Sequence, residues 1–298
     1  MANLISTKFK LTDTISIPWL SFGLYNIQEG KQLHHAINTA IEAGYRSFDS
    51  ATLYGNEAGV GKALNQSGIP RRELFITSKV WNSEQGYRET REAVQRCLER
   101  LQQDYIDLYL LHWPVPDKFI DSWRALEELH EEGVLKSIGV SNFIQDNLEA
   151  LLSVAKIKPV LNQVELHPHF AQFELEKYSK AQSIQLSAWS PLKHGKVLDD
   201  PTLTSLAEKY GKEPAQIILR WLYQRGIVAA VKAASVDHII KNIQLDDFAL
   251  TSEDISAINH LNQDRRIGPD PQTVDYSGDD EFIEIFTGWE TTAVTVDK

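Results

Sequence analysis

Short apolar runs alternate along this chain with segments whose apolar residues recur at the spacing of a single helix face. Val94, Cys97, Leu98 and Leu101 illustrate the helical spacing, at positions i, i+3, i+4 and i+7. The apolar runs have the length of buried strands and occupy residues 19–23, 46–49, 74–78, 106–111, 136–140, 160–164, 184–188 and 227–231. This alternation predicts parallel βα units. These eight runs fit a closed (β/α)₈ TIM barrel better than an open sheet, which usually carries a glycine-rich nucleotide fingerprint that this sequence lacks.

Both ends of the chain depart from the βα alternation. Residues 8–20 alternate apolar and polar side chains around Thr12 and Asp13, which predicts an N-terminal β-hairpin that plugs one end of the barrel. Thr251, with Asp254 three residues later, has the pattern of a helix N-terminal cap. Residues 263–298 are rich in Pro, Gly and Asp and predict a long C-terminal loop over one barrel mouth. Since nothing marks an interdomain linker, we expect one α/β domain spanning residues 1–298.

Composition and charge exclude several classes of protein. With 30 Lys+Arg against 41 Asp+Glu, the net charge of −11 argues against a nucleic-acid partner. No window approaches the ~18 apolar residues of a membrane span, and Lys8, Lys10 and Asp13 interrupt the N-terminus where a signal peptide needs an apolar core. The single cysteine, Cys97, cannot form an internal disulfide and belongs to a helix face expected to be buried. We therefore expect a cytoplasmic protein with no membrane partner.

Four polar residues near the ends of predicted strands carry candidate chemistry. Asp49 closes the second strand, Tyr54 lies five residues later, Lys79 follows the third strand and His112 the fourth. The carboxyl ends of barrel strands meet at one mouth, so these side chains should converge there, although each alone could be structural. A phenol beside an ammonium ion is a candidate acid with a lowered pKa, a carboxylate would orient the ammonium, and an imidazole could donate a hydrogen bond. This combination predicts carbonyl reduction, in which the acid protonates oxygen as hydride reaches carbon.

The segments that carry these residues resemble the aldo-keto reductase family along essentially the whole chain. The resemblance rests on six stretches in order: GYRSFDSATLYGNEAGVGKAL, ITSKVW, IDLYLLHWP, GVLKSIGVSNF, LNQVELHP and LSAWSPL. It implies a catalytic tetrad of Asp49, Tyr54, Lys79 and His112, with Tyr54 as the acid in reduction and the base in oxidation. It also implies an NAD(P)H-dependent oxidoreductase that reduces aldehydes and ketones to alcohols without a Rossmann fold.

The same resemblance assigns residues to the nicotinamide cofactor. Ser141, Asn142 and Gln163 are expected to hydrogen-bond the nicotinamide carboxamide. Trp189 stands where the family usually has a stacking tyrosine, and its indole also offers the nicotinamide ring a flat face. The other residues expected to contact the cofactor are Leu24, Ser190, Leu192, Lys232, Ser235, His238, Lys241 and Asn242.

The adenosine end departs from the pattern of NADPH-dependent relatives. In AVKAASVDHIIKN, Lys232 and Asn242 match the family pattern, whereas His238 and Lys241 replace an arginine and a glutamate. A histidine is mostly neutral near pH 7, unlike an arginine, but Lys232, Lys241 and the Ser235 hydroxyl can still hold a 2′-phosphate. We hypothesise that the protein prefers NADPH and discriminates weakly against NADH.

Aromatic residues are expected to line the carbonyl site. Tyr25, Trp81 and Trp113 follow the first, third and fourth strands and would form a wall beside His112. Such a wall suits aldehydes and ketones of modest polarity, but it does not choose among sugars, keto acids, methylglyoxal-like aldehydes and steroids. Three aromatic residues of the tail either line the same mouth or dock on the outer helices: Phe282, Phe286 and Trp289.

Two other functions are consistent with parts of the sequence. His167 and His169 form an H-x-H pair that, with Asp49 and His112, could serve a metal-dependent hydrolase, but no second cluster supports it and we expect no metal. A non-catalytic nicotinamide-binding regulatory subunit would also bind cofactor, but the complete tetrad favours catalysis. The family-level expectation for the oligomeric state is a monomer whose partner is a small carbonyl compound.

Overall fold

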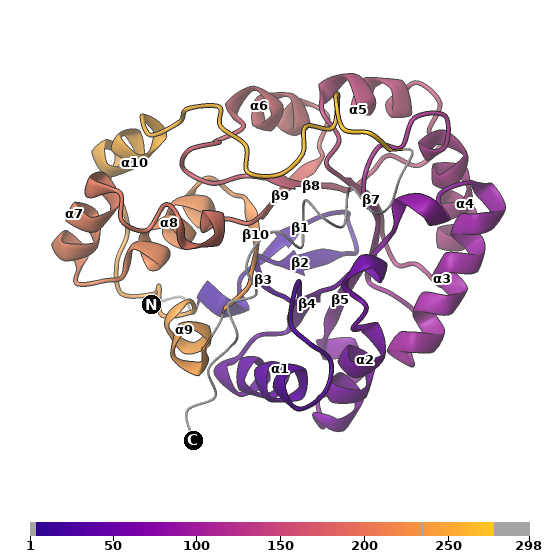
Figure 1. Cartoon of the computed structure of the whole chain (residues 1–298), viewed down its shortest axis with the longest axis horizontal. Coiled ribbons are helices and arrows are strands. Elements are labelled where there is room, and N and C mark those ends of the chain that lie inside the picture. The colour runs from indigo at the N-terminus through magenta and orange to yellow at the C-terminus, as the bar shows by residue number, and fades with distance from the viewer. Residues whose placement is uncertain (1–3, 234, 277–298) are drawn as a thin grey trace.

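The computed structural model describes residues 4–233 and 235–276, and at its centre is a closed barrel of parallel strands (Figure 1). The strands follow one another around the barrel in the order β3-β4-β5-β6-β7-β8-β9-β10, and β10 pairs with β3 to close it. Each apolar run predicted to be a strand forms one: β3 (Leu20–Gly23), β4 (Ser47–Asp49), β5 (Phe75–Val80), β6 (Leu108–Leu111), β7 (Ile138–Ser141), β8 (Leu161–Glu165), β9 (Gln185–Trp189) and β10 (Val228–Val231). The predicted barrel is confirmed.

Helices surround the barrel (Figure 1), and at least one helix connects each barrel strand from β3 to β9 to the next strand, while α9 and α10 follow β10. Their bounds are α1 (Lys31–Ala43), α2 (Glu57–Gln66), α3 (Tyr87–Leu101), α4 (Phe119–Glu131), α5 (Gln145–Leu152), α6 (Phe173–Ala181), α7 (Pro201–Tyr210), α8 (Pro214–Gln224), α9 (Val236–Lys241) and α10 (Ser252–Asn259). Short 3₁₀ turns lie at η1 (Leu4–Ser6), η2 (Thr52–Tyr54), η3 (Arg71–Glu73), η4 (Asn82–Glu84) and η5 (Lys193–Gly195).

The N-terminal hairpin closes the end of the barrel at which the strands begin. Strands β1 (Lys8–Lys10) and β2 (Ser16–Pro18) pair antiparallel, as predicted. Ile17 of β2 is only 2% exposed and packs with residues at or near the starts of barrel strands: Phe75, Leu108, Leu161 and Val228. The opposite mouth, where the strands end, remains available for a site.

The contact between α2 and α3 depends on a glycine. Cys97 and Leu101 on the inner face of α3 are fully buried, as their spacing predicted. A Cβ at Gly61 of α2 would lie 2.1 Å from the carbonyl oxygen of Leu101, far inside van der Waals contact. The two helices therefore approach as closely as they do because residue 61 has no side chain.

The last described helix begins at the predicted cap. Thr251 Oγ1 accepts the backbone N–H of Asp254 at 3.2 Å, and Asp254 Oδ2 accepts that of Thr251 at 3.1 Å. After α10 the chain continues to residue 276 without a helix or strand, in agreement with the predicted loop. The rest of the predicted tail lies outside the described residues, including Phe282, Phe286 and Trp289.

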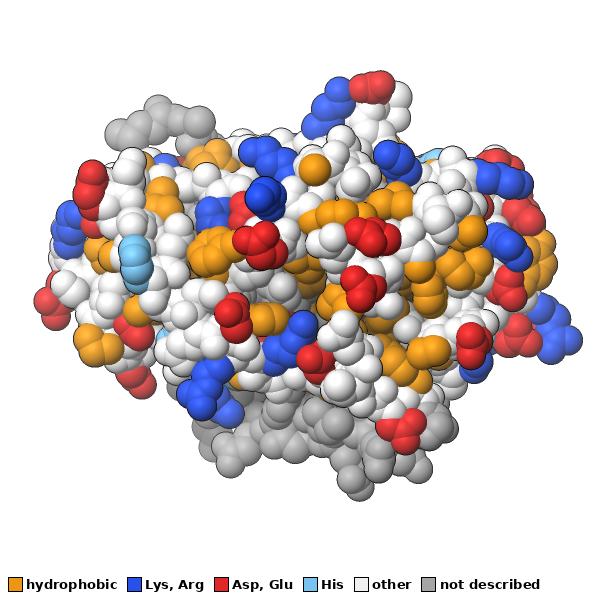
Figure 2. All heavy atoms as spheres, turned by 90° about the horizontal axis from the view of Figure 1, so that it is seen from above, with side chains coloured by type: hydrophobic (Ala, Val, Ile, Leu, Met, Phe, Trp, Pro, Cys, Tyr) orange, Lys and Arg blue, Asp and Glu red, His pale blue; other side chains and the backbone are white. Residues whose placement is uncertain are grey.

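Acidic and basic side chains are interspersed on the face of the molecule shown in Figure 2. Within residues 4–233 and 235–276, none of the helices combines the length and apolar character that crossing a membrane requires.

Candidate active site

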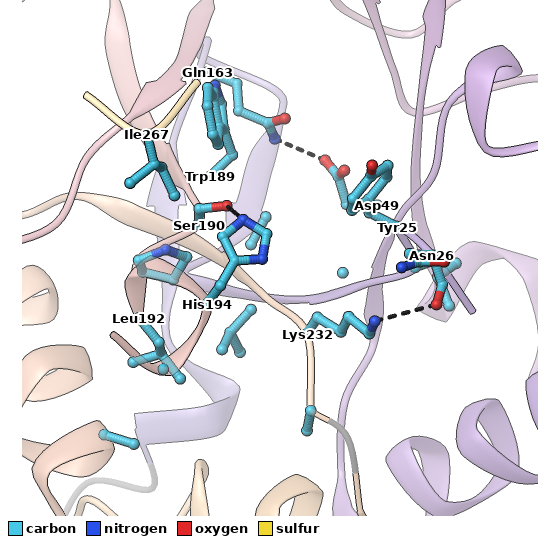
Figure 3. Close-up of a pocket in the computed structure, with 18 of the residues that line it drawn as sticks. Tyr25, Asn26, Asp49, Gln163, Trp189, Ser190, Leu192, His194, Lys232 and Ile267 are labelled. Carbon is cyan, nitrogen blue, oxygen red and sulfur yellow. Dashed lines mark hydrogen bonds between the residues drawn. The ribbon is translucent and has the colours of Figure 1, made fainter. Parts of the chain in front are cut away.

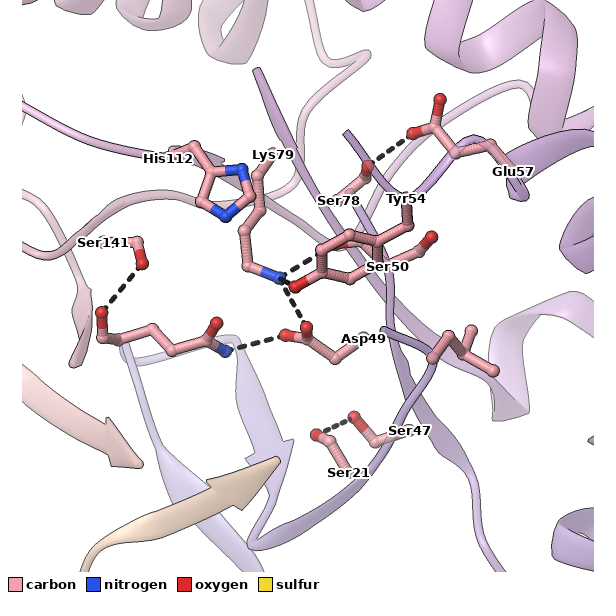
Figure 4. Close-up of polar contacts among 12 residues, drawn as sticks. Ser21, Ser47, Asp49, Ser50, Tyr54, Glu57, Ser78, Lys79, His112 and Ser141 are labelled. Carbon is pink, nitrogen blue, oxygen red and sulfur yellow. Dashed lines mark hydrogen bonds and ion pairs between the residues drawn. The ribbon is translucent and has the colours of Figure 1, made fainter. Parts of the chain in front are cut away.

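A buried ion pair joins the ends of β4 and β5. Lys79 Nζ lies 2.5 Å from Asp49 Oδ1, and the two side chains are 1% and 6% exposed. The same nitrogen donates to the backbone carbonyl of Ser50 at 2.9 Å and to the Tyr54 hydroxyl at 3.4 Å (Figure 4). Burial lowers the pKa of Lys79, and the Asp49 carboxylate opposes that shift. The carboxylate thus holds a cationic lysine against the phenol.

The pKa of Tyr54 differs from the sequence expectation. Tyr54 ends the 3₁₀ turn η2 that follows β4. Desolvation first, and the nearby Asp49 carboxylate second, raise the pKa of its phenol well above the usual value. The expectation of a lowered pKa is therefore wrong for this structure, because Asp49 balances the charge of Lys79 and desolvation disfavours the phenolate.

His112 completes the cluster as a neutral imidazole. Its ring centroid lies 6.1 Å from that of Tyr54 and 5.2 Å from that of Trp81. Burial, reinforced by the charge of Lys79, lowers the pKa of His112 well below its usual value. A neutral imidazole donates one hydrogen bond and accepts another. Asn142 Nδ2 donates to the backbone carbonyl of His112 at 3.0 Å and so ties the end of β6 to that of β7.

The polar residues expected to bind nicotinamide adjoin the Asp49–Lys79 pair. Gln163 Nε2 donates to Asp49 Oδ2 at 2.7 Å, and Ser141 Oγ donates to the Gln163 carbonyl at 2.8 Å. Asn142 Oδ1 accepts the indole N–H of Trp189 at 2.8 Å, which fixes the orientation of the indole ring. A continuous hydrogen-bonded set therefore runs from the ion pair across the ends of β7, β8 and β9.

A cavity of about 840 Å³ is lined by residues of this set and by residues of α8 and α9. Its volume falls within the range of small-molecule and cofactor sites. Lys232 Nζ donates to the Asn26 carbonyl at 3.1 Å, and Ser190 Oγ lies 3.1 Å from His194 Nε2 (Figure 3). The cavity wall includes these residues of the predicted site: Leu24, Tyr25, Asp49, Tyr54, His112, Trp113, Ser141, Asn142, Gln163, Trp189, Ser190, Leu192, Lys232, His238 and Asn242.

The cavity has the chemistry of a nicotinamide dinucleotide site. One end presents the phenol, the neutral imidazole, hydrogen-bonding groups and the flat face of Trp189. Lys232 and His238, a residue of α9, also line the cavity.

Residues 19–263 match the family model described as the aldo/keto reductase family. The chain belongs to this family. It is therefore an oxidoreductase, as its motifs indicated.

Relatives of this aldo/keto reductase align over most of its length. Glyoxal reductase of Bacillus subtilis is 50% identical over 262 residues, which cover 88% of this chain and 95% of that protein. Methylglyoxal reductase DkgA of Escherichia coli K12 is 43% identical over 275 residues, covering 91% and 98%. An aldo/keto reductase structure from Brucella melitensis has a TM-score of 0.83 at 48% identity, covering 86% and 99%. A Bombyx mori aldo-keto reductase in complex with NADP has a TM-score of 0.81 at 35% identity, covering 87% and 94%.

Lys241, expected to contact a 2′-phosphate, forms two ion pairs with acidic side chains. It is absent from the described cavity wall, and its Nζ lies 2.6 Å from Glu213 Oε1 and 2.7 Å from Asp237 Oδ2. The expectation that its charge serves a 2′-phosphate stays a prediction. Ser235, also expected to contact the cofactor, caps α9, since its Oγ accepts the His238 N–H at 3.2 Å.

Two other predicted residues lie behind the cavity wall of this aldo/keto reductase. Lys79 is beneath the phenol, and Trp81 packs on Trp113 in a small apolar cluster. Val274 and Tyr276 of the tail pack on the same cluster. The described tail therefore reaches the aromatic wall proposed for the substrate.

Sequence reasoning missed several residues of the cavity wall because they belong to loops and helix starts. These include Asn26, His194, Lys196, Glu213 and Ile267. Burial first, then the charges of Lys232 and Lys196, lower the pKa of His194 to about 4. His194 could have been suggested as a cavity residue because it is polar and lies in the long segment after β9. Nothing in the sequence indicated that Ile267 lines the cavity.

Glu165 attaches the tail to the barrel. Its Oε1 accepts the Ile267 N–H at 2.6 Å and its Oε2 accepts the Gly268 N–H at 2.9 Å. His167 Nε2 lies 3.0 Å from Glu165 Oε1, and both side chains are fully buried. The H-x-H histidine considered as a metal ligand thus supports this attachment. Throughout the described part of the chain, no three His, Cys, Asp or Glu residues are grouped so that they could hold a metal.

Proposed function

We propose that this aldo/keto reductase uses NADPH to reduce aldehydes and ketones to alcohols, with NADH as a weaker donor. The observation that carries the proposal is the position of Lys79 Nζ, 2.5 Å from Asp49 Oδ1 and 3.4 Å from the Tyr54 hydroxyl. NADP-bound relatives such as the Bombyx mori protein support the choice of cofactor.

In the proposed reaction, the bound nicotinamide supplies a hydride to the carbonyl carbon. Tyr54 donates its phenolic proton to the carbonyl oxygen, where negative charge develops. Its raised pKa keeps the phenol protonated at neutral pH, so the acid is loaded before reduction begins. Lys79 stabilises the phenolate that remains, and neutral His112 donates a hydrogen bond to the same substrate oxygen. Asp49 positions Lys79 and touches no substrate in this scheme.

We assign cofactor contacts to residues of the cavity wall. Ser141, Asn142 and Gln163 hold the carboxamide, and Trp189 stacks on the nicotinamide ring. Leu24 packs beneath the cofactor, while Ser190 and Leu192 lie along the pyrophosphate. Lys232, His238 and Asn242 receive the adenosine end.

We propose small aldehydes, including α-oxoaldehydes, as substrates. Tyr25 and Trp113 line the cavity beside His112, and Trp81 supports Trp113 from behind. The tail residue Tyr276 packs on that aromatic cluster. Relatives named glyoxal reductase and methylglyoxal reductase act on compounds of this size.

We further propose that residues 1–298 form one domain that acts as a cytoplasmic monomer. The single cysteine, Cys97, is buried and free, which suits a reducing compartment.

A substrate panel followed by the oxidation of NADPH, with NADH in parallel, tests the proposed function. We expect turnover of glyoxal, methylglyoxal and simple aldehydes, with a higher kcat/KM for NADPH than for NADH. Equal efficiency with the two cofactors would overturn the NADPH preference, and no turnover of any carbonyl compound would overturn the proposed reaction.

A further inference from the structure

The segment that carries Tyr54 continues into a buried asparagine whose side chain reaches two neighbouring loops. Asn56 lies two residues after Tyr54, immediately before α2, and is 1% exposed. Its Nδ2 donates to the backbone carbonyls of Leu24 at 2.9 Å and Ile27 at 3.2 Å. Its Oδ1 accepts the Ser50 hydroxyl at 3.0 Å. One buried amide thus joins the loop after β3 to the loop after β4.

The loop after β3 forms a turn at residues 24–27 that this amide helps to close. The backbone N–H of Ile27 donates to the Leu24 carbonyl at 3.4 Å, whereas Asn56 Nδ2 lies 2.9 Å from the same oxygen. Asn26, inside the turn, has a φ of 54°, which lies in the sparsely populated left-handed region. Hydrogen bonds weaken with length, so the asparagine side chain supplies the stronger of the two bonds to the Leu24 carbonyl.

The turn at residues 24–27 carries two groups that shape the cavity. The ring of Tyr25 lines the cavity, with its centroid 5.0 Å from that of Tyr54 and its plane at 65° to that ring. The backbone carbonyl of Asn26 accepts Lys232 Nζ at 3.1 Å (Figure 3). Asn56 is not among the described residues of the cavity wall, so any effect it has on the cavity passes through the turn.

The backbone on which Asn56 stands is fixed to the same strand ends as the tetrad. The next residue, Glu57, is 2% exposed, accepts the Ser78 hydroxyl at 2.5 Å and lies 2.6 Å from Arg100 Nη2. These bonds attach the start of α2 to β5 and to α3. Ser50, the partner of Asn56 Oδ1, also accepts the tetrad lysine through its backbone carbonyl at 2.9 Å (Figure 4). The amide therefore holds the turn at residues 24–27 at a set distance from the tetrad.

We propose that Asn56 is a positioning residue that fixes the turn at residues 24–27, and through it the places of Tyr25 and Lys232 in the cavity wall. The inference rests on the proposed function, because it takes Tyr25 to contact the carbonyl substrate and Lys232 to contact the cofactor. Asn56 touches neither of them. Its loss should therefore weaken the binding of both while leaving the phenol of Tyr54 in place.

The test replaces the amide with a group of the same shape. In Asn56→Asp an oxygen faces the two backbone carbonyls, and a carboxyl group cannot supply two donors whether it is ionised or protonated. Two buried hydrogen bonds correspond to roughly a 10-fold or larger change in an equilibrium constant. The KM for methylglyoxal and the Kd for NADPH, measured by calorimetry, should each rise by about that factor, whereas kcat should change much less.

Further variants separate positioning from a general loss of structure. In a Tyr25→Ala background, Asn56→Asp should cause little further rise in the KM for methylglyoxal, because the ring that it positions is gone. Asn65→Asp makes the same substitution at an exposed position of α2 and is the matched control, with wild-type KM and Kd expected. Ser50→Ala removes only the bond to Asn56 Oδ1 and should raise the KM by about 2-fold or more. Thermal melting of each variant verifies folding.

The outcomes distinguish this inference from the proposed function. A folded Asn56→Asp protein with wild-type KM and Kd would overturn the role of Asn56, as would an equally large rise in KM when Tyr25 is already alanine. If Asn56→Asp does not fold, an unchanged KM in Ser50→Ala overturns the inference. A wild-type protein that reduces no aldehyde would overturn the proposed function itself.

Discussion

Replacing Lys79 with methionine removes the cation from the buried ion pair and should destabilise the protein. At an effective dielectric constant of about 20, opposite charges separated by 2.5 Å attract by ~7 kcal/mol, part of which offsets the desolvation of both groups. Methionine leaves the Asp49 carboxylate in place without its counter-ion. Losing one partner of a buried pair typically costs about 3–5 kcal/mol, so we expect Lys79→Met to lower the free energy of unfolding by that amount.

Urea denaturation at pH 7 measures this loss, and two further variants identify its cause. Lys79→Met/Asp49→Asn should recover much of the stability, because it removes the isolated charge. Lys10→Met breaks a pair whose side chains are 68% and 96% exposed and should leave the unfolding midpoint unchanged. A loss below about 1 kcal/mol for Lys79→Met, or no recovery in the double variant, would refute the electrostatic argument.

Three further predictions concern other parts of the structure. The pKa of His194 is lowered to about 4 in the folded protein, against about 6.5 in the unfolded chain. Between pH 4 and pH 6.5 the unfolded chain therefore binds more protons at this histidine than the folded protein does. The free energy of unfolding should fall as pH drops from 6.5 to 4, and His194→Gln should make urea midpoints less dependent on pH over that range. Gly61→Ala should destabilise by about 1–3 kcal/mol or more, visible as a lower Tm, because its Cβ would meet the Leu101 carbonyl at 2.1 Å. Glu165→Gln should place an amide donor against the backbone N–H groups of residues 267–268 and so loosen the tail. The KM for aldehydes should then rise. An unchanged KM would show that this attachment does not shape the substrate site.

The barrel and the convergence of the tetrad were predictable because they follow from local patterns. Strands such as β5 and β6 are short runs buried on both faces, which favours apolar residues along their length. Asp49, Lys79 and His112 lie at or just after strand ends, where barrel geometry brings side chains together. The hairpin and the Thr251 cap were likewise encoded within a few residues.

The properties that the sequence did not predict are set by contacts distant in the sequence. The pKa of Tyr54 depends on how deeply its hydroxyl is buried, which the DSATLYGNE motif does not specify. A partner of Lys241 is Glu213, 28 residues earlier, and only the tertiary fold brings the start of α8 to the end of α9. Ile267 joins the cavity wall because Glu165, 102 residues earlier, accepts its backbone N–H.

The central claim is that Tyr54 is the proton donor in carbonyl reduction, and Tyr54→Phe tests it most directly. The substitution removes one hydroxyl and keeps the ring that packs against Tyr25. Turnover of methylglyoxal at saturating NADPH should fall by about 10²- to 10⁴-fold, the usual contribution of a general acid, while the Kd for NADPH stays near its wild-type value. A variant that binds NADPH normally and still turns over the aldehyde at a near wild-type rate would contradict the account.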